Sequence, residues 1–385
     1  LYYSLLLAQL AATMGVFCAL DTALFFLFWE LSLIPLYFLV SLWGVGPQRR
    51  FAAARYTLLM LASGVPLLFG FLLLAFNHAS VLGVPLPEGL AFDLRVLLAT
   101  PVPHRLEQAV FVLLLLGFAA KAPLLPLHTW LPETAMQGAP PVTALLVGLK
   151  LGIYGILRFA VPLAPEVARE FHWLLAGLGT ASLLYGAVAA LAQTNLRRML
   201  AYAGVSHVGL VVLGIASFNA TGIQGAVLQT LNFTLVAGGL FLLTGMLQRR
   251  VGSPAMLSRG GAARTMPRMA ARYLVFALAS IGLPGTSGFP AELLLLVSAL
   301  TTHTGAGLAA LFGLVIAAGY MLGSYRRAFF GLVGNPAVAE ADDLAPAEFA
   351  FALGVAVLVV AVGVYPALFL DLIAPAAGAW LERGG

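Results

Sequence analysis

Long apolar runs dominate this sequence and determine the solvent in which it can fold. Runs such as 109–120 and 349–364 exceed what a buried strand needs, and several approach the ~20 residues that cross ~30 Å of hydrocarbon. Hydrophobic residues make up 61% of the chain and charged residues only 9%, against roughly a quarter charged in a soluble domain. The sequence therefore predicts an all-α integral membrane protein surrounded by lipid.

About eleven segments are apolar enough to be transmembrane helices, and loops with proline, glycine and arginine separate them. They cover residues 3–20, 22–44, 54–76, 108–127, 141–162, 172–193, 198–217, 222–247, 272–301, 306–330 and 347–372. We interpret the whole chain, residues 1–385, as one transmembrane domain.

The arginines test this layout, because short cytoplasmic loops collect positive charge. When the loops are assigned alternately to two sides, 13 arginines fall on one side and 5 on the other. The larger set is Arg49, Arg50, Arg55, Arg197, Arg198, Arg249, Arg250, Arg259, Arg264, Arg268, Arg272, Arg326 and Arg327, and the smaller set is Arg95, Arg105, Arg158, Arg169 and Arg383. The asymmetry supports the helix count and places the first side in the cytoplasm. Because the basic residues are dispersed, the net charge of +5 reflects topology, and we expect no nucleic-acid partner.

Two further observations narrow the class of protein. The single cysteine, Cys18, excludes an internal disulfide and a cysteine-held iron–sulfur cluster or zinc site, so we expect no redox centre on this chain. The chain opens at Leu1 without a methionine or a basic region before a cleavage site, and we expect a truncated start rather than a signal peptide.

Proline and glycine interrupt two of the spans. The interruptions are Lys121-Ala-Pro-Leu-Leu-Pro126 and Gly282-Leu-Pro-Gly-Thr-Ser-Gly-Phe-Pro290. Unwound backbone at membrane depth survives only inside protein or beside a watery cavity, and paired interrupted helices mark the binding region of inverted-repeat transporters. The alternative is a pair of proline kinks that only shape the packing.

Five ionisable residues on five different spans share one depth. The only two lysines of the chain, Lys121 and Lys150, both lie inside spans, and Lys121 follows about twelve apolar residues, or roughly 18 Å of helix. Glu30, His207 and Glu292 lie similarly deep in their spans. Inserting a charged residue at mid-membrane depth costs at least ~2.5–3.5 kcal/mol, so an ionisable residue found there indicates a functional role. The alternative, a purely structural ion pair between Glu30 and a lysine, explains one pair more readily than five groups at one level.

These residue types suit a proton relay. A buried lysine releases its proton more easily than one in water, a nearby carboxylate opposes this, and histidine titrates near neutrality. His128, just past the first interruption, is either a relay member at the cytoplasmic rim or a helix-capping histidine. Tyr154, Ser206 and Gln229 could hold water molecules, although polar residues in membrane helices are more often packing partners. The sequence predicts proton movement across the bilayer.

Four long motifs occur in order along the chain. They are Phe25-Phe-Leu-Phe-Trp-Glu-Leu-Ser-Leu-Ile-Pro-Leu-Tyr37, Lys121-Ala-Pro-Leu-Leu-Pro-Leu-His-Thr-Trp-Leu-Pro-Glu133, Leu200-Ala-Tyr-Ala-Gly-Val-Ser-His-Val-Gly209 and Gly282-Leu-Pro-Gly-Thr-Ser-Gly-Phe-Pro-Ala-Glu292. Together they resemble the antiporter-like subunits of respiratory complex I, over about residues 5–370. Glu292, where related subunits carry lysine, resembles chain M, the mitochondrial chain 4 type, rather than chains L or N.

The resemblance implies an architecture. We expect two inverted five-helix repeats, at 3–162 and 172–330, each with one broken helix, followed by a final helix at 347–372. The first three helices of a fourteen-helix fold would be absent.

The resemblance also implies roles. Glu30 would be the carboxylate that modulates Lys121, the proton-holding lysine. Lys150 and His207 would form the central connection, and Glu292 would be the exit-side carboxylate. The chain would be a proton-translocating subunit of an NADH:quinone oxidoreductase in a bacterial inner (cytoplasmic) membrane. It would contact other membrane subunits and carry no cofactor, with flavin, iron–sulfur clusters and quinone on partner subunits.

The sequence departs from the family at two places. Pro132-Glu-Thr-Ala135 stands where the family usually has Pro-Asp-Ala-His, and the stretch from there to Lys150 is short. Asn232-Phe233 replaces a histidine common in the helix around residues 229–239.

Two other functions stay open at this point. One is a subunit of a related complex: a multisubunit cation/proton antiporter, a membrane-bound hydrogenase or a carbon-dioxide-uptake complex. The other is a scaffold subunit whose charges are structural. No pattern resembles a phosphate-binding loop, a flavin site or a nucleophilic triad, so we expect no bond chemistry on this chain.

Overall fold

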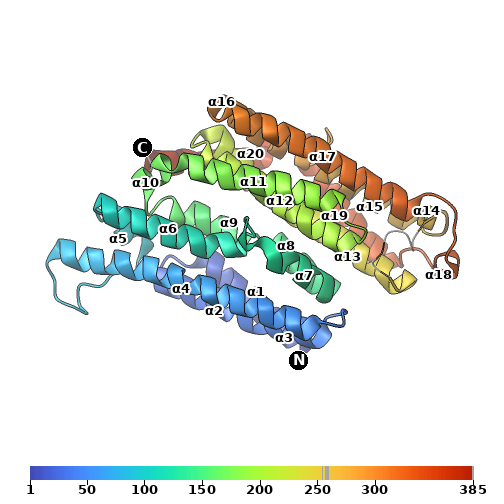
Figure 1. Cartoon of the computed structure of the whole chain (residues 1–385), viewed down its shortest axis with the longest axis horizontal. Coiled ribbons are helices and arrows are strands. Elements are labelled where there is room, and N and C mark those ends of the chain that lie inside the picture. Colours follow the sequence, from blue (N-terminus) through green and yellow to red (C-terminus); the bar gives the residue numbers. More distant parts are fainter. Residues whose placement is uncertain (254, 256–259, 384–385) are drawn as a thin grey trace.

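The apolar segments form helices that lie side by side in one elongated bundle in the computed structural model (Figure 1). The structure describes residues 1–253, 255 and 260–383, and these contain helices and no β-strand. Eight helical runs among them are long and apolar enough to cross a membrane, and Tyr2–Cys18 and Gly288–Thr302 are shorter apolar helices. The predicted all-α integral membrane architecture is confirmed.

The first half of the bundle has helices at each predicted span, although the helix of span 108–127 ends at Lys121 and span 141–162 is divided. It contains α1 (Tyr2–Cys18), α2 (Thr22–Leu31), α3 (Leu33–Trp43), α4 (Arg49–Leu82), α5 (Leu94–Ala99), α6 (His104–Lys121), the 3-10 turn η1 (Leu127–Thr129), α7 (Trp130–Gln137), α8 (Pro140–Gly148), α9 (Leu151–Gly155) and the π-helical turn η2 (Ile156–Ala160).

The second half repeats the alternation of long and interrupted helices. It contains α10 (Pro165–Glu170), α11 (His172–Leu191), α12 (Leu196–Ala216), α13 (Ala220–Val251), α14 (Ala262–Thr265), α15 (Pro267–Ser280), α16 (Gly288–Thr302), α17 (Thr304–Phe329), α18 (Pro336–Ala339), α19 (Pro346–Val364) and α20 (Ala367–Arg383). Each half contains one of the predicted interruptions, and the first half contains another at residues 149–150, between α8 and α9. The inverted symmetry of the two repeats stays a prediction.

The predicted final helix at 347–372 is two helices. Helix α19 ends at Val364, and α20 starts at Ala367 after Pro366. Tyr365 has φ −128° and ψ 68°, outside the helical region, because a proline disfavours the helical conformation of the residue before it. Trp380 on α20 donates a hydrogen bond from its indole nitrogen to the Leu157 carbonyl oxygen at 2.8 Å, which fixes the last helix to η2.

The two ends of the bundle carry the two sets of arginines. Helices α5 and α10 lie at one end, and α14 and α18 lie at the other (Figure 1). Arg95 and Arg169 belong to the first end, whereas Arg264 and the end of α17, with Arg326, belong to the second. Arg259 lies outside the described residues.

Arg197 differs from the loop charge that the sequence predicted. Its side chain is buried, and its guanidinium donates hydrogen bonds to the Gly138 carbonyl oxygen, to Thr143 Oγ1 at 3.3 Å and to Gln248 Oε1 at 3.3 Å. These partners lie after α7, on α8 and on α13, so Arg197 joins the start of α12 to three other segments.

We expect Arg197→Met to destabilise the fold by ~2–3 kcal/mol, because hydrogen bonds to a buried charged group are worth ~1.5–3 kcal/mol. Arg198→Met, at the exposed neighbouring position, should change stability by less than ~0.5 kcal/mol. The thermal denaturation midpoints of the two purified variants in detergent test this difference. Equal midpoints would show that Arg197 contributes no more than an exposed arginine.

The unwound segments of the two interruptions have partners inside the protein. In the first, residues 122–126 follow α6, and the Leu125 amide donates to Ser182 Oγ at 3.0 Å. The Trp130 indole donates to the Ala120 carbonyl oxygen at 2.8 Å. In the second, residues 281–287 separate α15 from α16, and the Ser287 amide donates to the Val359 carbonyl oxygen at 2.9 Å. These are true breaks, as predicted, rather than simple proline kinks.

Helix α19 packs directly on the second break. A Cβ atom added to Gly363 would collide with the backbone of Thr286, whereas one added to Gly354, on the same helix, would meet no atom within 4 Å. Only a residue without a side chain lets α19 approach the break this closely.

Gly363→Ala should therefore destabilise the protein by ~1–3 kcal/mol, the usual cost of overpacking a close contact. Gly354→Ala should be neutral or stabilising by up to ~1 kcal/mol, since alanine is the better helix former. The measurement is the shift of the denaturation midpoint for each variant. A stabilising Gly363→Ala would mean that α19 is free to move away from the break.

Candidate functional site

Lys121 is the last residue of α6 and lies where the first break begins. Its amine is 3.0 Å from Ser32 Oγ and 3.5 Å from the Trp29 carbonyl oxygen, and it lies 4.1 Å from the centre of the Trp29 ring. The side chain is buried, and it lies at the C-terminal end of a helix, where the helix dipole favours a cation. The groups in direct contact with this amine are therefore neutral.

Glu30 lies on α2 between the two residues that contact Lys121. One carboxylate oxygen packs against Gly64 of α4, where any side chain would collide with it. Among the described residues, neither oxygen has a hydrogen-bond partner, and no ion pair joins Glu30 to Lys121. The structural ion pair considered from the sequence is therefore not formed. Glu30 also borders an apolar groove on α2, α3 and α4.

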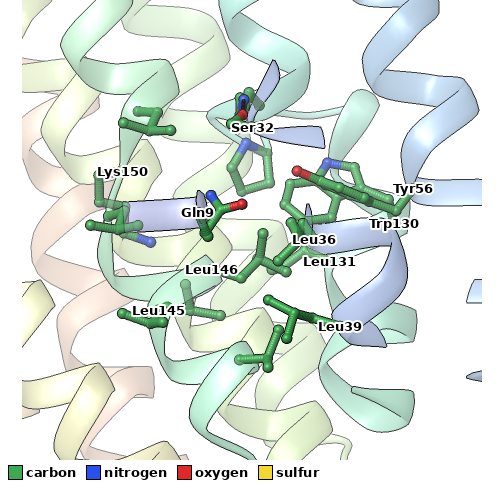
Figure 2. Close-up of a pocket in the computed structure, with 16 residues that line it drawn as sticks. Gln9, Ser32, Leu36, Leu39, Tyr56, Trp130, Leu131, Leu145, Leu146 and Lys150 are labelled. Carbon is green, nitrogen blue, oxygen red and sulfur yellow. Dashed lines mark hydrogen bonds between the residues drawn. The ribbon is translucent and has the colours of Figure 1, made fainter. Parts of the chain in front are cut away.

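Lys121 and Lys150 line one buried cavity. The other polar residues in its wall include Gln9 of α1 and Ser32, and Figure 2 shows Gln9 in the middle of the lining, between Lys150 and Trp130. The cavity volume is about 30 Å³, and because one water needs ~10–15 Å³, about two water molecules fit. Gln9 is buried, and its carbonyl oxygen has no hydrogen-bond partner in the described part of the chain. The cavity thus lies between two amines, and the rest of its wall is mostly apolar.

Lys150 interrupts a third helix, which the sequence did not predict. Helix α8 ends at Gly148, α9 starts at Leu151, and Lys150 between them has φ 43° and ψ 37°. This left-handed conformation is uncommon for a residue with a side chain. The amine lies 4.0 Å from the centre of the Phe233 ring, a cation–π distance. The predicted span at 141–162 is therefore two helices and a π-helical turn, with the lysine at the joint.

His207 and Glu292 form a buried pair between α12 and α16. His207 Nδ1 lies 3.7 Å from Glu292 Oε1, and Gln229 Nε2 of α13 lies 3.3 Å from the first atom and 3.4 Å from the second. The Phe233 ring centre is 5.1 Å from the His207 ring centre. Phe233 therefore contacts both Lys150 and His207, at one of the two positions that replace a histidine common in the family.

His128 does not cap a helix. It lies in η1, and the N-cap of α7 is Thr129, whose side chain makes no capping bond. The imidazole is buried and packs edge-on against Tyr185 at 4.9 Å between ring centres. It lines a cavity together with Arg55 and Glu133, which form an ion pair at 3.0 Å. Membership of a relay stays a prediction for His128.

The structure brings the five predicted groups into one file. From Lys121 the order by shared contacts is the cavity, Lys150, Phe233, His207 and Glu292. Glu30 precedes Lys121 through its neighbours Trp29 and Ser32, which contact the lysine. Sequence reasoning missed Gln9, although an amide in an otherwise apolar segment was a usable signal. For Tyr154 the sequence allowed either a water-holding role or a packing role. The structure supports packing, because the Tyr154 hydroxyl donates to the Phe17 carbonyl oxygen at 2.9 Å.

A family model now gives this geometry its context. The model described as NADH:quinone oxidoreductase/Mrp antiporter, TM matches residues 19–317. The chain belongs to this family.

Individual members of the NADH:quinone oxidoreductase/Mrp antiporter family are also similar to this chain. NAD(P)H-quinone oxidoreductase chain 4 1 of Synechococcus sp. (strain JA-2-3B'a(2-13)) is 38% identical over 379 residues, which cover 96% of this chain and 70% of that protein. NADH-quinone oxidoreductase subunit M of Pseudomonas aeruginosa is 38% identical over 378 residues, which cover 95% and 72%. The predicted resemblance to chain M and chain 4 is confirmed.

Solved structures extend the family comparison. A chain of respiratory complex I from Thermus thermophilus with bound NADH has a TM-score of 0.93 at 34% identity, over 100% of this chain and 80% of that one. A chain of the Mrp complex from Dietzia sp. DQ12-45-1b has a TM-score of 0.84 at 26% identity, over 100% and 41%. Both belong to assemblies of several membrane subunits, which supports the predicted class of partner.

The backbone of Lys150 gives a prediction that is independent of its charge. Lys150→Gly should be more stable than Lys150→Ala by ~1–3 kcal/mol, because only glycine adopts the left-handed conformation without strain. Denaturation midpoints of the two variants, both without the amine, measure the difference. An alanine variant as stable as the glycine variant would show that residue 150 relaxes into an ordinary helix.

Proposed function

We propose that this chain is a proton-translocating membrane subunit of an NADH:quinone oxidoreductase of the complex I type. The observation that carries the proposal is a series of five ionisable residues from five spans, of which four are buried and Glu30 is half-buried. A cavity joins the two lysines, Phe233 lies between Lys150 and His207, and His207 pairs with Glu292. The identities of 38% with chain 4 and subunit M support this assembly over the related ones.

The electron-transfer chemistry belongs to other subunits in this proposal. The single cysteine, Cys18, is exposed and leaves no cysteine-held cluster on this chain. Flavin, iron–sulfur clusters and quinone would then be bound by partner subunits, and this chain would respond to their chemistry. Its site would lie in a bacterial inner membrane.

The roles follow from where each group lies. Lys121 holds a proton beside the break. Glu30, which is close in sequence to the hydrogen-bond partners of Lys121, Trp29 and Ser32, modulates how tightly the lysine holds that proton. Water in the cavity carries the proton between Lys121 and Lys150. His207 and Glu292 exchange it after a small approach or through one water molecule, because their nearest atoms are 3.7 Å apart and direct transfer needs ~2.6–3.2 Å.

Phe233 lies between Lys150 and His207 and obstructs proton transfer from one to the other more than any other step of the proposed relay is obstructed. Its ring contacts both groups and cannot accept or donate a proton. Transfer there needs water to pass the ring, or the ring to turn. The central step is therefore the point at which this chain can prevent protons from leaking.

Two other functions were considered. A subunit of a multisubunit cation/proton antiporter is favoured by the Mrp chain, whose TM-score is 0.84, but the identity is only 26%. A scaffold would need the buried charges only as structural contacts, yet the lysines and Glu30 form no ion pair among the described residues.

The proposal is tested by proton pumping into inverted membrane vesicles that carry the assembled complex. In Lys121→Met and Glu30→Gln we expect the initial rate of vesicle acidification to fall strongly, because losing a proton-transfer group slows its step by ~10²–10⁴. Arg326→Gln, which removes an exposed charge at the end of α17, serves as the control and should pump normally. Assembly is verified for every variant.

Unchanged acidification in both Lys121→Met and Glu30→Gln would show that the buried charges are structural. Acidification that requires added sodium would favour the cation/proton antiporter alternative.

A further inference from the structure

A chain of side-chain hydrogen bonds leads from the second helix break to the His207–Glu292 pair. Ser287 Oγ donates to Asn232 Oδ1 at 2.6 Å, and Asn232 Nδ2 donates to Gln229 Oε1 at 3.0 Å. Gln229 Nε2 then lies between His207 Nδ1 and Glu292 Oε1, at 3.3 Å and 3.4 Å. All five side chains are buried, and Ser287 and Gln229 have no exposed surface.

The direction of this chain is determined by chemistry. An ionised Glu292 only accepts hydrogen bonds, so Gln229 must present its NH₂ group to the carboxylate and its oxygen to Asn232. Asn232 must then present its NH₂ group to Gln229 and its oxygen to Ser287, whose hydroxyl donates. The opposite orientation of the two amides would place the Gln229 oxygen against the ionised carboxylate, where neither group donates a hydrogen bond.

The same direction determines which nitrogen of His207 carries the proton. Because Gln229 donates its NH₂ group towards Nδ1, that nitrogen acts as an acceptor and the neutral ring carries its proton on Nε2. Nδ1 is also the atom nearest Glu292. The Gln229 NH₂ group thus holds Nδ1 beside the carboxyl group with which His207 exchanges a proton.

The chain starts in unwound backbone rather than in a regular helix. Ser287 is the last residue before α16, and its amide donates to the Val359 carbonyl oxygen of α19 at 2.9 Å. Both its backbone and its hydroxyl are therefore held by other helices. The shape of the break determines where the hydroxyl points.

We propose that Ser287, Asn232 and Gln229 are positioning residues that hold the acceptor nitrogen of His207 towards Glu292. The inference rests on the proposed function, since it specifies the geometry of one transfer step in that relay. It gives the second break a role besides placing Glu292, because the break supplies the hydroxyl that anchors Asn232 and, through it, Gln229.

The chain offers a matched control for the key hydroxyl. Ser298 of α16 is also buried, and its Oγ donates to Asn219 Oδ1, next to α13, at 2.9 Å. Ser287→Ala and Ser298→Ala therefore remove similar serine–asparagine bonds between the same two parts of the fold. Ser287→Thr keeps the hydroxyl, and Asn232→Leu removes the next link in the chain.

The variants are compared in the assembled complex by vesicle acidification. Ser287→Ala should slow acidification about fivefold, the factor that one hydrogen bond of average strength represents. Ser287→Thr should restore the rate, and Ser298→Ala should leave it unchanged. If Ser287→Ala fails to assemble, Asn232→Leu decides, with the same expected loss.

Infrared spectroscopy of the Glu292 carboxyl group separates positioning from general packing. Its band, assigned by its loss in Glu292→Gln, should shift in Ser287→Ala and Asn232→Leu but not in Ser298→Ala. Equal effects of the two serine variants on rate and spectrum would overturn the inference. If Glu292→Gln and Lys121→Met pump normally, the proposed function itself fails.

Discussion

The cost of holding charge away from water is the constraint on which this structure depends. Lys121 is surrounded by a hydroxyl, a carbonyl and an indole ring, Lys150 by a phenyl ring, and Glu292 by an amide and an imidazole. These neutral partners lower the cost of burial without fixing the charge, as a close ion pair would. A side chain with neutral partners of this kind can release its proton and bind it again, as a proton carrier must.

The same scarcity of water governs the backbone. Each break gives up helical hydrogen bonds, and each recovers partners from another helix: Ser182 of α11 for the first, and the Val359 carbonyl of α19 for the second. The functional side chains lie at or beside these irregular points, with Lys121 before one break, Lys150 at a joint and Glu292 after the other. Irregular backbone thus occurs where side chains from several helices must converge.

Much of this arrangement was predictable from the sequence, because depth in the membrane is a one-dimensional property. Counting apolar residues placed the five ionisable groups at one level, and proline and glycine located both breaks. Contacts between distant segments were not predictable. Nothing near Arg197 in the sequence indicated partners at Gly138 and Gln248, and nothing near Phe233 indicated its place between Lys150 and His207. Pro366 was a sequence signal for the split of the last predicted span, but the continuous apolar run across it led to the prediction of a single helix.

The left-handed backbone at Lys150 restricts which amino acids position 150 accepts. Glycine and asparagine tolerate the conformation, but neither carries an amine, whereas arginine carries a charge with the same backbone strain and a bulkier, planar head. Most single substitutions there are therefore penalised twice, once for the lost amine and once for the strained conformation. A chain that acquires a different residue at this position must first rebuild the joint between two helices, which makes the central connection the hardest part of this molecule to alter in small steps.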